Sequence, residues 1–251
     1  MRIAVAGATG RVGSHVVDVL AERGHDGVAI SRSAGVDIIT GRGLAEALSG
    51  VDCVIDVATG PSPEGTAATE FFTTAARNLQ AAGKSAGVSR MVVVSIIACD
   101  KFKGGYGSAK VAHEQAMLAG PVPARVLRAA QFHEFVAQLL DWGRQGDVIY
   151  LPRLRTQLVA ARTVAEALVD LATAPERASD GLPTPEIAGP REEDLVEMAK
   201  LLAAKHGEAV RIEAVSDPAD PDHDLYLNGS LLPSPHAQLG GPTFEAWLRE
   251  R

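Results

Sequence analysis

The stretch AVAGATGRVGS, residues 4–14, places glycines at positions 7, 10 and 13 directly after a short apolar run. A strand that enters a helix through such a turn points backbone N–H groups at one place, where the helix N-terminus adds about half a positive charge. Gly7 would make the tight turn, Gly10 would let a ligand approach the backbone, and Gly13 would let the helix pack on the sheet. The stretch therefore predicts a pyrophosphate site in a βα unit, with a plain tight turn as the alternative.

Short apolar runs alternate with helical patterns in the N-terminal half of the chain. Strands buried on both faces of a sheet are expected at the continuous apolar runs, residues 3–6, 27–31, 53–58, 91–97 and 124–127. Helices are expected where apolar residues repeat with a helical period, from Val12 to a cap at Gly24, over residues 64–86 and over residues 108–119. This alternation predicts an α/β fold, a Rossmann-like doubly wound parallel sheet with right-handed crossovers.

The rhythm is looser after residue 131. We expect a helix that holds Phe132 and Leu140, a helix that begins at a capping box of Thr163 and Glu166, and a short docked helix in the closing TFEAWL. Further elements are expected as strands at 148–151, 157–160 and 209–215, a helix at 192–205 and a surface loop at 216–224. Residues 1–130 should form the nucleotide-binding core, and residues 131–251 a small substrate-capping part packed on it as one compact unit.

Composition narrows the classes of protein to consider. The chain has 251 residues, of which 46% are hydrophobic, so a full core can be buried. Its 24 Lys and Arg stand against 31 Asp and Glu, which gives no basic surface for nucleic acid or an anionic membrane. No apolar run is long enough for a transmembrane helix or a signal peptide, so a cytoplasmic protein is expected.

Cysteine and histidine positions indicate no metal site. Cys53 and Cys99 have no metal-binding or redox spacing and lie in or beside apolar runs, where a reduced, buried thiol is expected. His223 lies among aspartates in a proline-containing stretch, which favours a solvated loop. His113 and Glu114 are expected to be polar residues on a helix surface.

The end of the second apolar run decides the expected cofactor. Dinucleotide folds place the adenosine ribose here, and a carboxylate at this point would favour NAD. Arg32 stands there instead, between Ser31 and Ser33, and a guanidinium offers the donor fork that a 2′-phosphate needs. NADP(H) is therefore the expected cofactor, with NAD(H) still possible and a solvated arginine as the alternative. Asp37 either bonds the adenine or holds a turn, and Arg11 either reaches a phosphate or stays exposed.

Several motifs resemble those of the short-chain dehydrogenase/reductase superfamily, and more closely its atypical, NmrA-like NAD(P)H-binding branch. They are GATGRVG, the SRS at 31–33, LAEALSGVDCVIDVA, AARNLQAAGKSAGVSRMVVVSIIA, YGSAKVAHEQ and VLRAAQFHEF. The resemblance covers about residues 1–140 and implies a Rossmann-like core whose C-terminal part caps the nicotinamide end.

The resemblance also implies catalytic residues. Reductases of the superfamily use a Tyr-x-x-x-Lys pair and a serine, which correspond here to Tyr106, Lys110 and Ser95. Tyr106 would pass a proton to a carbonyl oxygen, Ser95 would hold that oxygen, and Lys110 would favour the phenolate and grip the nicotinamide ribose. The glycines around Tyr106 leave open that it precedes the helix. Gln131 and His133 would lie at the crevice mouth, His133 either as another proton donor or as a polar residue bonded to a neighbour.

These observations lead to one expected function and two rivals. The cofactor site should comprise Gly7, Ala8, Thr9, Gly10, Arg11, Val12, Gly13, Ser31, Arg32, Ser33, Asp37, Val57, Ala58, Thr59, Ser95, Lys110, Ala129, Ala130 and Gln131. The expected function is NADPH-dependent reduction of a small, largely apolar carbonyl or quinone-like substrate. One rival is a non-catalytic NADP(H) sensor that acts on a protein partner. The other, a sugar-nucleotide epimerase or dehydratase, is disfavoured because the C-terminal part shows no basic cluster for a second diphosphate.

Overall fold

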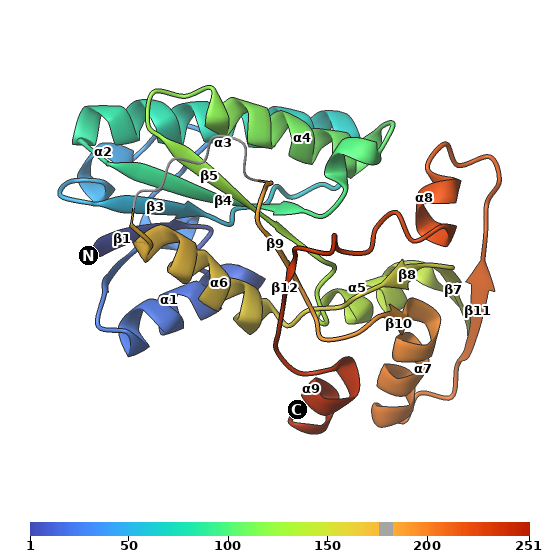
Figure 1. The fold of residues 1–251 in the computed structure, drawn as a ribbon. Helices are drawn as coiled ribbons and strands as arrows, with labels where there is room; N and C mark the ends of the chain where they lie inside the picture. Colours follow the sequence, from blue (N-terminus) through green and yellow to red (C-terminus); the bar gives the residue numbers. More distant parts are fainter. Residues whose placement is uncertain (176–182) are drawn as a thin grey trace.

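A parallel sheet forms the centre of the molecule (Figure 1). The computed structural model describes residues 1–175 and 183–251. In these residues seven strands pair in the order β12-β9-β5-β4-β3-β1-β2, and every pairing is parallel. The strands are β1 (Arg2–Ala6), β2 (Asp26–Ile30), β3 (Cys53–Asp56), β4 (Arg90–Ile96), β5 (Ala124–Ala129), β9 (Glu186–Ala188) and β12 (Gln238–Leu239).

Helices cover both faces of this sheet. One face carries α1 (Arg11–Glu22) and α6 (Ala161–Thr173), and the other carries α3 (Gly65–Ala86) and α4 (Gly105–Leu118) with the short α2 (Leu44–Ala47) (Figure 1). The predicted Rossmann-like doubly wound fold is therefore confirmed. Short 3-10 turns, η1 (Arg32–Ala34) and η2 (Cys99–Lys101), follow β2 and β4 at the edge where nucleotide-binding folds hold their ligands.

The smaller part of the chain lies beyond the carboxyl end of β5. It consists of α5 (Phe135–Gly143), β6 (Arg144–Gln145), β7 (Val148–Pro152), β8 (Arg155–Thr156), β10 (Glu193–Asp194), α7 (Leu195–Lys205), β11 (Arg211–Val215), α8 (His223–Leu227) and α9 (Phe244–Arg249). Strand β7 pairs in parallel with β11 and antiparallel with β6, which makes a second small sheet.

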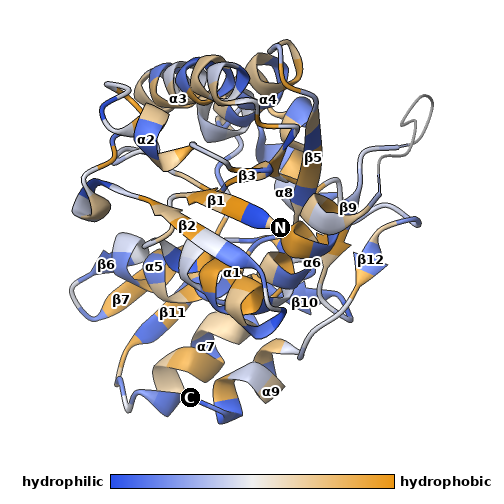
Figure 2. Cartoon of the chain, turned by 90° about the vertical axis from the view of Figure 1, so that its left-hand side faces the viewer, coloured by the Kyte–Doolittle hydropathy of each residue, from blue (hydrophilic) through white to orange (hydrophobic). Residues whose placement is uncertain are grey.

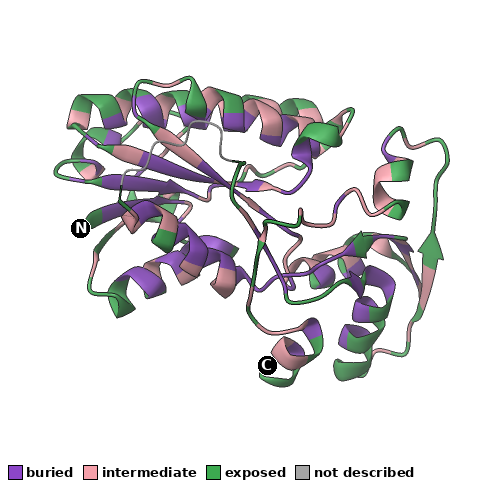
Figure 3. Cartoon of the chain, viewed as in Figure 1, coloured by how far each residue is buried: buried purple, intermediate pink, exposed green. Residues whose placement is uncertain are grey.

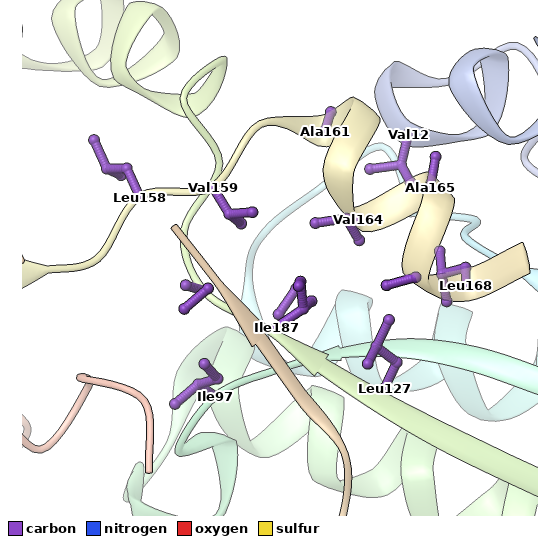
Figure 4. Close-up of a cluster of buried hydrophobic side chains, with 14 of the residues drawn as sticks. Val12, Ile97, Leu127, Leu158, Val159, Ala161, Val164, Ala165, Leu168 and Ile187 are labelled. Atoms are coloured by element: carbon purple, nitrogen blue, oxygen red, sulfur yellow. The ribbon is translucent and has the colours of Figure 1, made fainter. Parts of the chain in front are cut away.

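One apolar core runs from the large sheet into this smaller part. Its buried side chains include Val5 of β1, Leu127 of β5, Leu168 of α6, Leu195 of α7 and Phe244 of α9. Hydrophobic segments gather in the sheet and in the helices around it (Figure 2), and the central strands are buried along most of their length (Figure 3). Figure 4 shows how side chains of α6 meet those of β5 and β9. Burial of this surface ties the two parts of the chain together.

The structure corrects the expected starts of two helices. Helix α6 begins at Ala161, so Thr163 lies inside it instead of capping it, and Glu166 pairs with Arg162 at 2.8 Å. The backbone N–H of Ala161 is bonded by the carboxylate of Glu134, a residue distant in sequence. Helix α7 begins at Leu195, because the side chain of Asp194 accepts from the first turn and acts as its N-cap.

Other expected elements differ in smaller ways. The segment 157–160 contributes one bridge, between Val159 and Phe132, in place of a full strand. Helix α5 consequently begins only at Phe135, and the loop at 216–224 ends in α8. Strands β9 and β12 were not predicted, because strands of three and two residues are too short to show a pattern. In the described residues, no helix is both long and apolar enough to cross a membrane.

Candidate functional site

The glycine turn joins β1 to α1 with the geometry that its sequence predicts. Gly7 has a φ of +83°, and a Cβ on it would lie 2.8 Å from Cα of Ala58. A Cβ on Gly13 would lie 2.0 Å from the carbonyl oxygen of Gly7, so α1 packs directly on the turn. At Gly10 the only neighbour of such a Cβ is the Gly7 carbonyl, at 3.1 Å, which leaves the other side of the turn open.

This turn fits a pyrophosphate. Gly10 is the N-cap of α1 and provides no side chain to cap it. The backbone N–H groups of Arg11, Val12 and Gly13 have no acceptor among residues 1–175 and 183–251. Free N–H groups at the start of a twelve-residue helix, beside a glycine with open space, form an anion site. The residues present therefore suit the phosphates of a dinucleotide.

Arg32 lies at the carboxyl end of β2, where its side chain is exposed. Its guanidinium has no bond or ion pair to any described residue. The neighbouring hydroxyls of Ser31 and Ser33 lie 2.9 Å apart, and the oxygen of Ser31 also accepts from the N–H of Ala34. The donor fork of Arg32 is thus available to a ligand at the end of the strand.

Two polar residues near this edge have structural partners. The carboxylate of Asp37 accepts from the backbone N–H of Ile39 at 2.8 Å and of Thr40 at 3.3 Å, so it holds a turn. Of the two readings of Asp37, the structure therefore supports the turn. The exposed guanidinium of Arg11 lies 3.4 Å from the side-chain oxygen of Gln138 in α5.

Tyr106 contacts the segment that follows β3. It lies in the first turn of α4, half-buried, so the reading that places it before the helix is wrong. Its hydroxyl is 3.4 Å from the hydroxyl of Thr59, and either group can donate. Thr59 follows Ala58, which packs against Gly7. The phenol is therefore one residue removed from the segment that contacts the turn.

The electrostatic role expected for Lys110 is not what the structure shows. Burial raises the pKa of Tyr106, and the bond to Thr59 offsets this only in part. The ammonium of Lys110 donates to the carbonyl of Val94 at 2.8 Å and lies 2.9 Å from Nδ1 of His113. The ammonium is not among the groups that shift the pKa of the phenol, which differs from the predicted role.

His113 and Glu114 are buried, which corrects their expected place on the helix surface. His113 is 1% exposed, and its Nε2 lies 3.0 Å from the carboxylate of Asp56, which is fully buried at the end of β3. Glu114 is 8% exposed and makes two bonds to the guanidinium of Arg128, at 2.9 and 3.0 Å. Both therefore face the sheet on the same side of α4 as Lys110.

Ser95 is buried next to the contacts of Glu114 and does not lie at an open surface. Its side chain is 1% exposed, and its hydroxyl donates to the sulfur of Cys99 at 3.7 Å. Cys99 in turn donates to Glu114 at 3.2 Å, and burial raises the pKa of its thiol to about 11. Since Ser95 is engaged inside the protein, its position differs from that of a residue holding a substrate oxygen.

The residues at and just after the end of β5 have their partners within the protein. The backbone of Ala129 and Ala130 bonds to Ile97 and to Ile187 within the sheet. The side-chain oxygen of Gln131 accepts from Thr156 at 2.6 Å.

His133 is fully buried instead of lying at a crevice mouth. Its Nε2 bonds the carbonyl of Pro242 at 3.1 Å, and its ring packs against Phe244 and Trp247. The reading of His133 as a polar residue bonded to a neighbour is therefore the correct one.

The structure also contains two hollows and a polar loop. A hollow of about 400 Å³ lies in the C-terminal part, and one of about 580 Å³ lies between the starts of α3 and α4. The first is lined by Arg153, Leu154, Arg155, Asp194, Val196, Glu197, Lys200, Ile212, Ala214, Tyr226 and Leu227. In the loop, His223 lies 3.3 Å from the hydroxyl of Ser216. Within the described part of the chain, no group of three or more His, Cys, Asp or Glu could hold a metal ion.

Residues 7–132 match the model of a protein family described as NAD(P)H-binding. This match begins at Gly7 and extends just beyond β5, so it covers half of the chain and the whole candidate site around the glycine turn. The chain belongs to the NAD(P)H-binding family. No curated protein matches its sequence.

Three solved structures illustrate the proteins that share this fold. MoeE5 in complex with UDP-glucuronic acid and NAD is 19% identical, with a TM-score of 0.68 and 100% of both chains covered. UDP-N-acetylglucosamine 4-epimerase from Bacillus cereus is 18% identical, with a TM-score of 0.67, covering 100% of this chain and 97% of that one. A short-chain dehydrogenase/reductase superfamily protein from Agrobacterium tumefaciens with bound NAD is 18% identical, with a TM-score of 0.68 and coverage of 100% and 95%. At these identities the likeness shows the fold of the superfamily.

For this NAD(P)H-binding chain, sequence reasoning missed the partners of Lys110. Asp56 lies in the apolar run 53–58, which was interpreted only as a strand, and His113 was expected on the surface of its helix. A signal was present: positions 106, 110, 113 and 117 recur at helical spacing, which puts His113 on the stripe that faces the sheet. The partner across the interface, Asp56, could be found only once α4 was placed on β3 and β4.

Proposed function

We propose that the protein is an NADPH-dependent reductase of a small, largely apolar carbonyl or quinone-like substrate. The observation that carries this proposal is the half-buried hydroxyl of Tyr106, which pairs with Thr59 next to the segment that packs on the glycine turn. A proton donor beside the place for a dinucleotide is the arrangement that carbonyl reduction needs. The free guanidinium of Arg32 supports NADPH over NADH.

In this proposal each residue of the site has a separate role. NADPH supplies a hydride when bound. The hydroxyl of Tyr106 donates a proton to the carbonyl oxygen, while Thr59 fixes the orientation of the phenol. Lys110 contributes a donor to the nicotinamide ribose, and the N–H groups at the start of α1 hold the pyrophosphate.

The test combines an acceptor panel with one variant. We expect wild-type protein to oxidise NADPH with at least one member of a panel of quinones, ketones and aldehydes. Tyr106→Phe keeps the ring and removes the hydroxyl, so turnover of a ketone should fall by about 10²–10⁴ while NADPH affinity is unchanged. A quinone should be affected less, because its reduced ring can take a proton from water.

Two controls make this result specific. Tyr150→Phe removes the hydroxyl of a tyrosine in β7 and should leave turnover unchanged. UDP-sugars should be tested separately with NADP+ and NAD+, because their hydroxyls can give a hydride to the oxidised cofactor and structures of similar fold are found in complex with them. Equal ketone turnover by wild type and Tyr106→Phe would contradict the role of Tyr106.

A second candidate, an NADP(H) sensor, is favoured by one observation. The ammonium of Lys110 is held by Val94 and His113 and does not favour the phenolate of Tyr106. A sensor would bind NADPH tightly, reduce no acceptor in the panel, and change its protection from proteolysis on binding. That combination of results would replace the reductase proposal.

A further inference from the structure

A buried network of polar contacts links the end of β3 to helix α4. The carboxylate of Asp56 in β3 lies 3.0 Å from Nε2 of His113 in α4, and Nδ1 of His113 lies 2.9 Å from the ammonium of Lys110. Asp56, His113 and Lys110 are 0%, 1% and 4% exposed. Buried polar groups of this kind are costly unless each is paired, so the three residues depend on one another.

The donors and acceptors available to Asp56, His113 and Lys110 determine which group donates in each of these hydrogen bonds. An ionised carboxylate only accepts, so His113 donates from Nε2 to Asp56 and leaves the lone pair of Nδ1 free. Lys110 only donates, and it gives one hydrogen to Nδ1 and a second to the carbonyl of Val94. The third hydrogen of the ammonium has no oxygen or nitrogen acceptor among the described residues.

The same carboxylate also holds the glycine turn. The second oxygen of Asp56 accepts from the backbone N–H of Ala58 at 3.0 Å, and Ala58 is the residue that packs on Gly7. Asp56 therefore connects the expected pyrophosphate site with Lys110.

An aromatic ring covers His113 and Lys110. The ring of Phe72 in α3 stacks on His113 with 4.6 Å between centroids, and the ammonium of Lys110 lies 4.4 Å from the centroid of the same ring. A cation over an aromatic face is stabilised when water is excluded. Phe72 thus limits both the rotation of the imidazole and the movement of the ammonium.

We infer that Asp56 and His113 are positioning residues that orient Lys110 toward the cofactor and keep it charged. This inference rests on the proposed function, in which Lys110 contacts the nicotinamide ribose. It adds that the imidazole serves as a fixed acceptor in its Nε2–H form and takes no part in proton transfer.

The charge of Lys110 should make cofactor affinity depend on pH. Burial lowers the pKa of Lys110 to about 8, while the carboxylates of Asp56 from β3 and Glu114 from α4 act in the opposite direction. The thiol of Cys99 from η2, whose pKa burial raises to about 11, is neutral at pH 8. Arg128 of β5 is paired with Glu114. Burial, and then the charge of Lys110, lower the pKa of His113, so the imidazole stays neutral. Because an amine is charged below its pKa, affinity for NADPH should fall as pH rises through about 8.

The experiment is calorimetric titration of the full chain with NADPH between about pH 7 and 9.5, the range that brackets this pKa. Loss of a charge-assisted bond weakens binding by about ten- to a hundredfold. We expect that loss for His113→Leu at pH 7. His113→Gln should bind within about threefold of wild type, because the Gln amide can donate to Asp56 and accept from Lys110 as the neutral imidazole does.

A charge variant tests the pH dependence. Asp56→Asn keeps the size and the bond to Ala58, but it removes both the negative charge and the acceptor that faces Nε2 of His113. The pKa of Lys110 should then drop, and the fall in affinity should move to lower pH by about one unit. Gln80→Leu is the control, since Gln80 is a buried polar residue of α3 that bonds Met117 near the end of α4 and Val122 in the segment after it.

Each outcome has a defined meaning. Wild-type affinity in His113→Leu or in Lys110→Met, or a pH profile unchanged in Asp56→Asn, would overturn the inference. So would equal losses in His113→Gln, His113→Leu and Gln80→Leu, since that pattern reports loss of stability alone. The measurement needs no acceptor. NADPH binding that follows the expected pattern without any turnover would therefore refute the reductase proposal and leave the positioning role in place.

Discussion

Two cations of this chain have opposite surroundings, and the difference separates their roles. Arg32 is exposed after β2 with no partner among the described residues, so it can meet a phosphate without losing other bonds. Lys110 is 4% exposed and has its partners inside the protein. An exposed guanidinium is suited to choose between cofactors, and a buried ammonium is suited to hold a fixed position.

The choice of cofactor should depend on Arg32. We expect Arg32→Ala to weaken NADPH binding by about ten- to a hundredfold and to leave NADH binding unchanged, because only NADPH carries the 2′-phosphate. Titration of both cofactors measures this. Arg77→Ala, which removes an exposed arginine of α3, should change neither. Equal losses for NADPH and NADH in Arg32→Ala would rule out the 2′-phosphate assignment.

At the scale of elements, the β1–α1 unit shows how one turn combines packing with binding. Gly13 is required by the close approach of α1 to the carbonyl of Gly7, whereas Gly10 faces open space. Helix α4 combines roles in the same way. Its first turn presents Tyr106, and its buried stripe carries Lys110, His113 and Glu114.

Substitutions at two glycines should separate binding from stability. Gly10→Val should abolish binding of both cofactors and keep the circular dichroism spectrum, because the added side chain occupies the expected pyrophosphate place. Gly13→Ala should lower the free energy of unfolding by about 1–3 kcal/mol, because its Cβ would overlap the Gly7 carbonyl. Denaturant titration measures the second effect. Undiminished NADPH affinity in a folded Gly10→Val protein would place the dinucleotide elsewhere.

At the scale of the whole molecule, the late part of the chain completes the sheet that the early part begins. Strand β9 pairs with β5 and β12 pairs with β9, while helix α6 lies beside α1 on one face of the sheet and α9 packs against the core (Figure 1). The apolar cluster is continuous from β1 to α9. The two parts should therefore unfold together.

Truncation of the side chain that docks α9 tests this. Phe244 is fully buried, so Phe244→Ala should lower the free energy of unfolding by about 3–5 kcal/mol. Tryptophan fluorescence and circular dichroism should report one coincident transition in both proteins. Leu118→Ala, at a position 56% exposed, should have little effect. Separate transitions for the two probes would show that the parts unfold independently.

The sequence alone determined the doubly wound sheet, the glycine turn and the place of Arg32. These features are local: an apolar run, a helical period and a glycine that needs positive φ each lie within a few neighbouring residues. The ends of strands β1 to β5 were therefore predicted to within one or two residues. The NAD(P)H-binding family follows from the same local motifs.

Only the tertiary structure decided what the buried polar residues do. His113 and Asp56 are 57 positions apart, and Glu134 supports a helix that begins 27 positions later. Local periodicity cannot report such pairs, because a polar residue on a helix is satisfied equally well by water or by a distant partner. Packing of α4 on the sheet excluded the water and left Asp56 and His113 as the partners of Lys110, since a buried charge without such partners would cost more than the fold can supply.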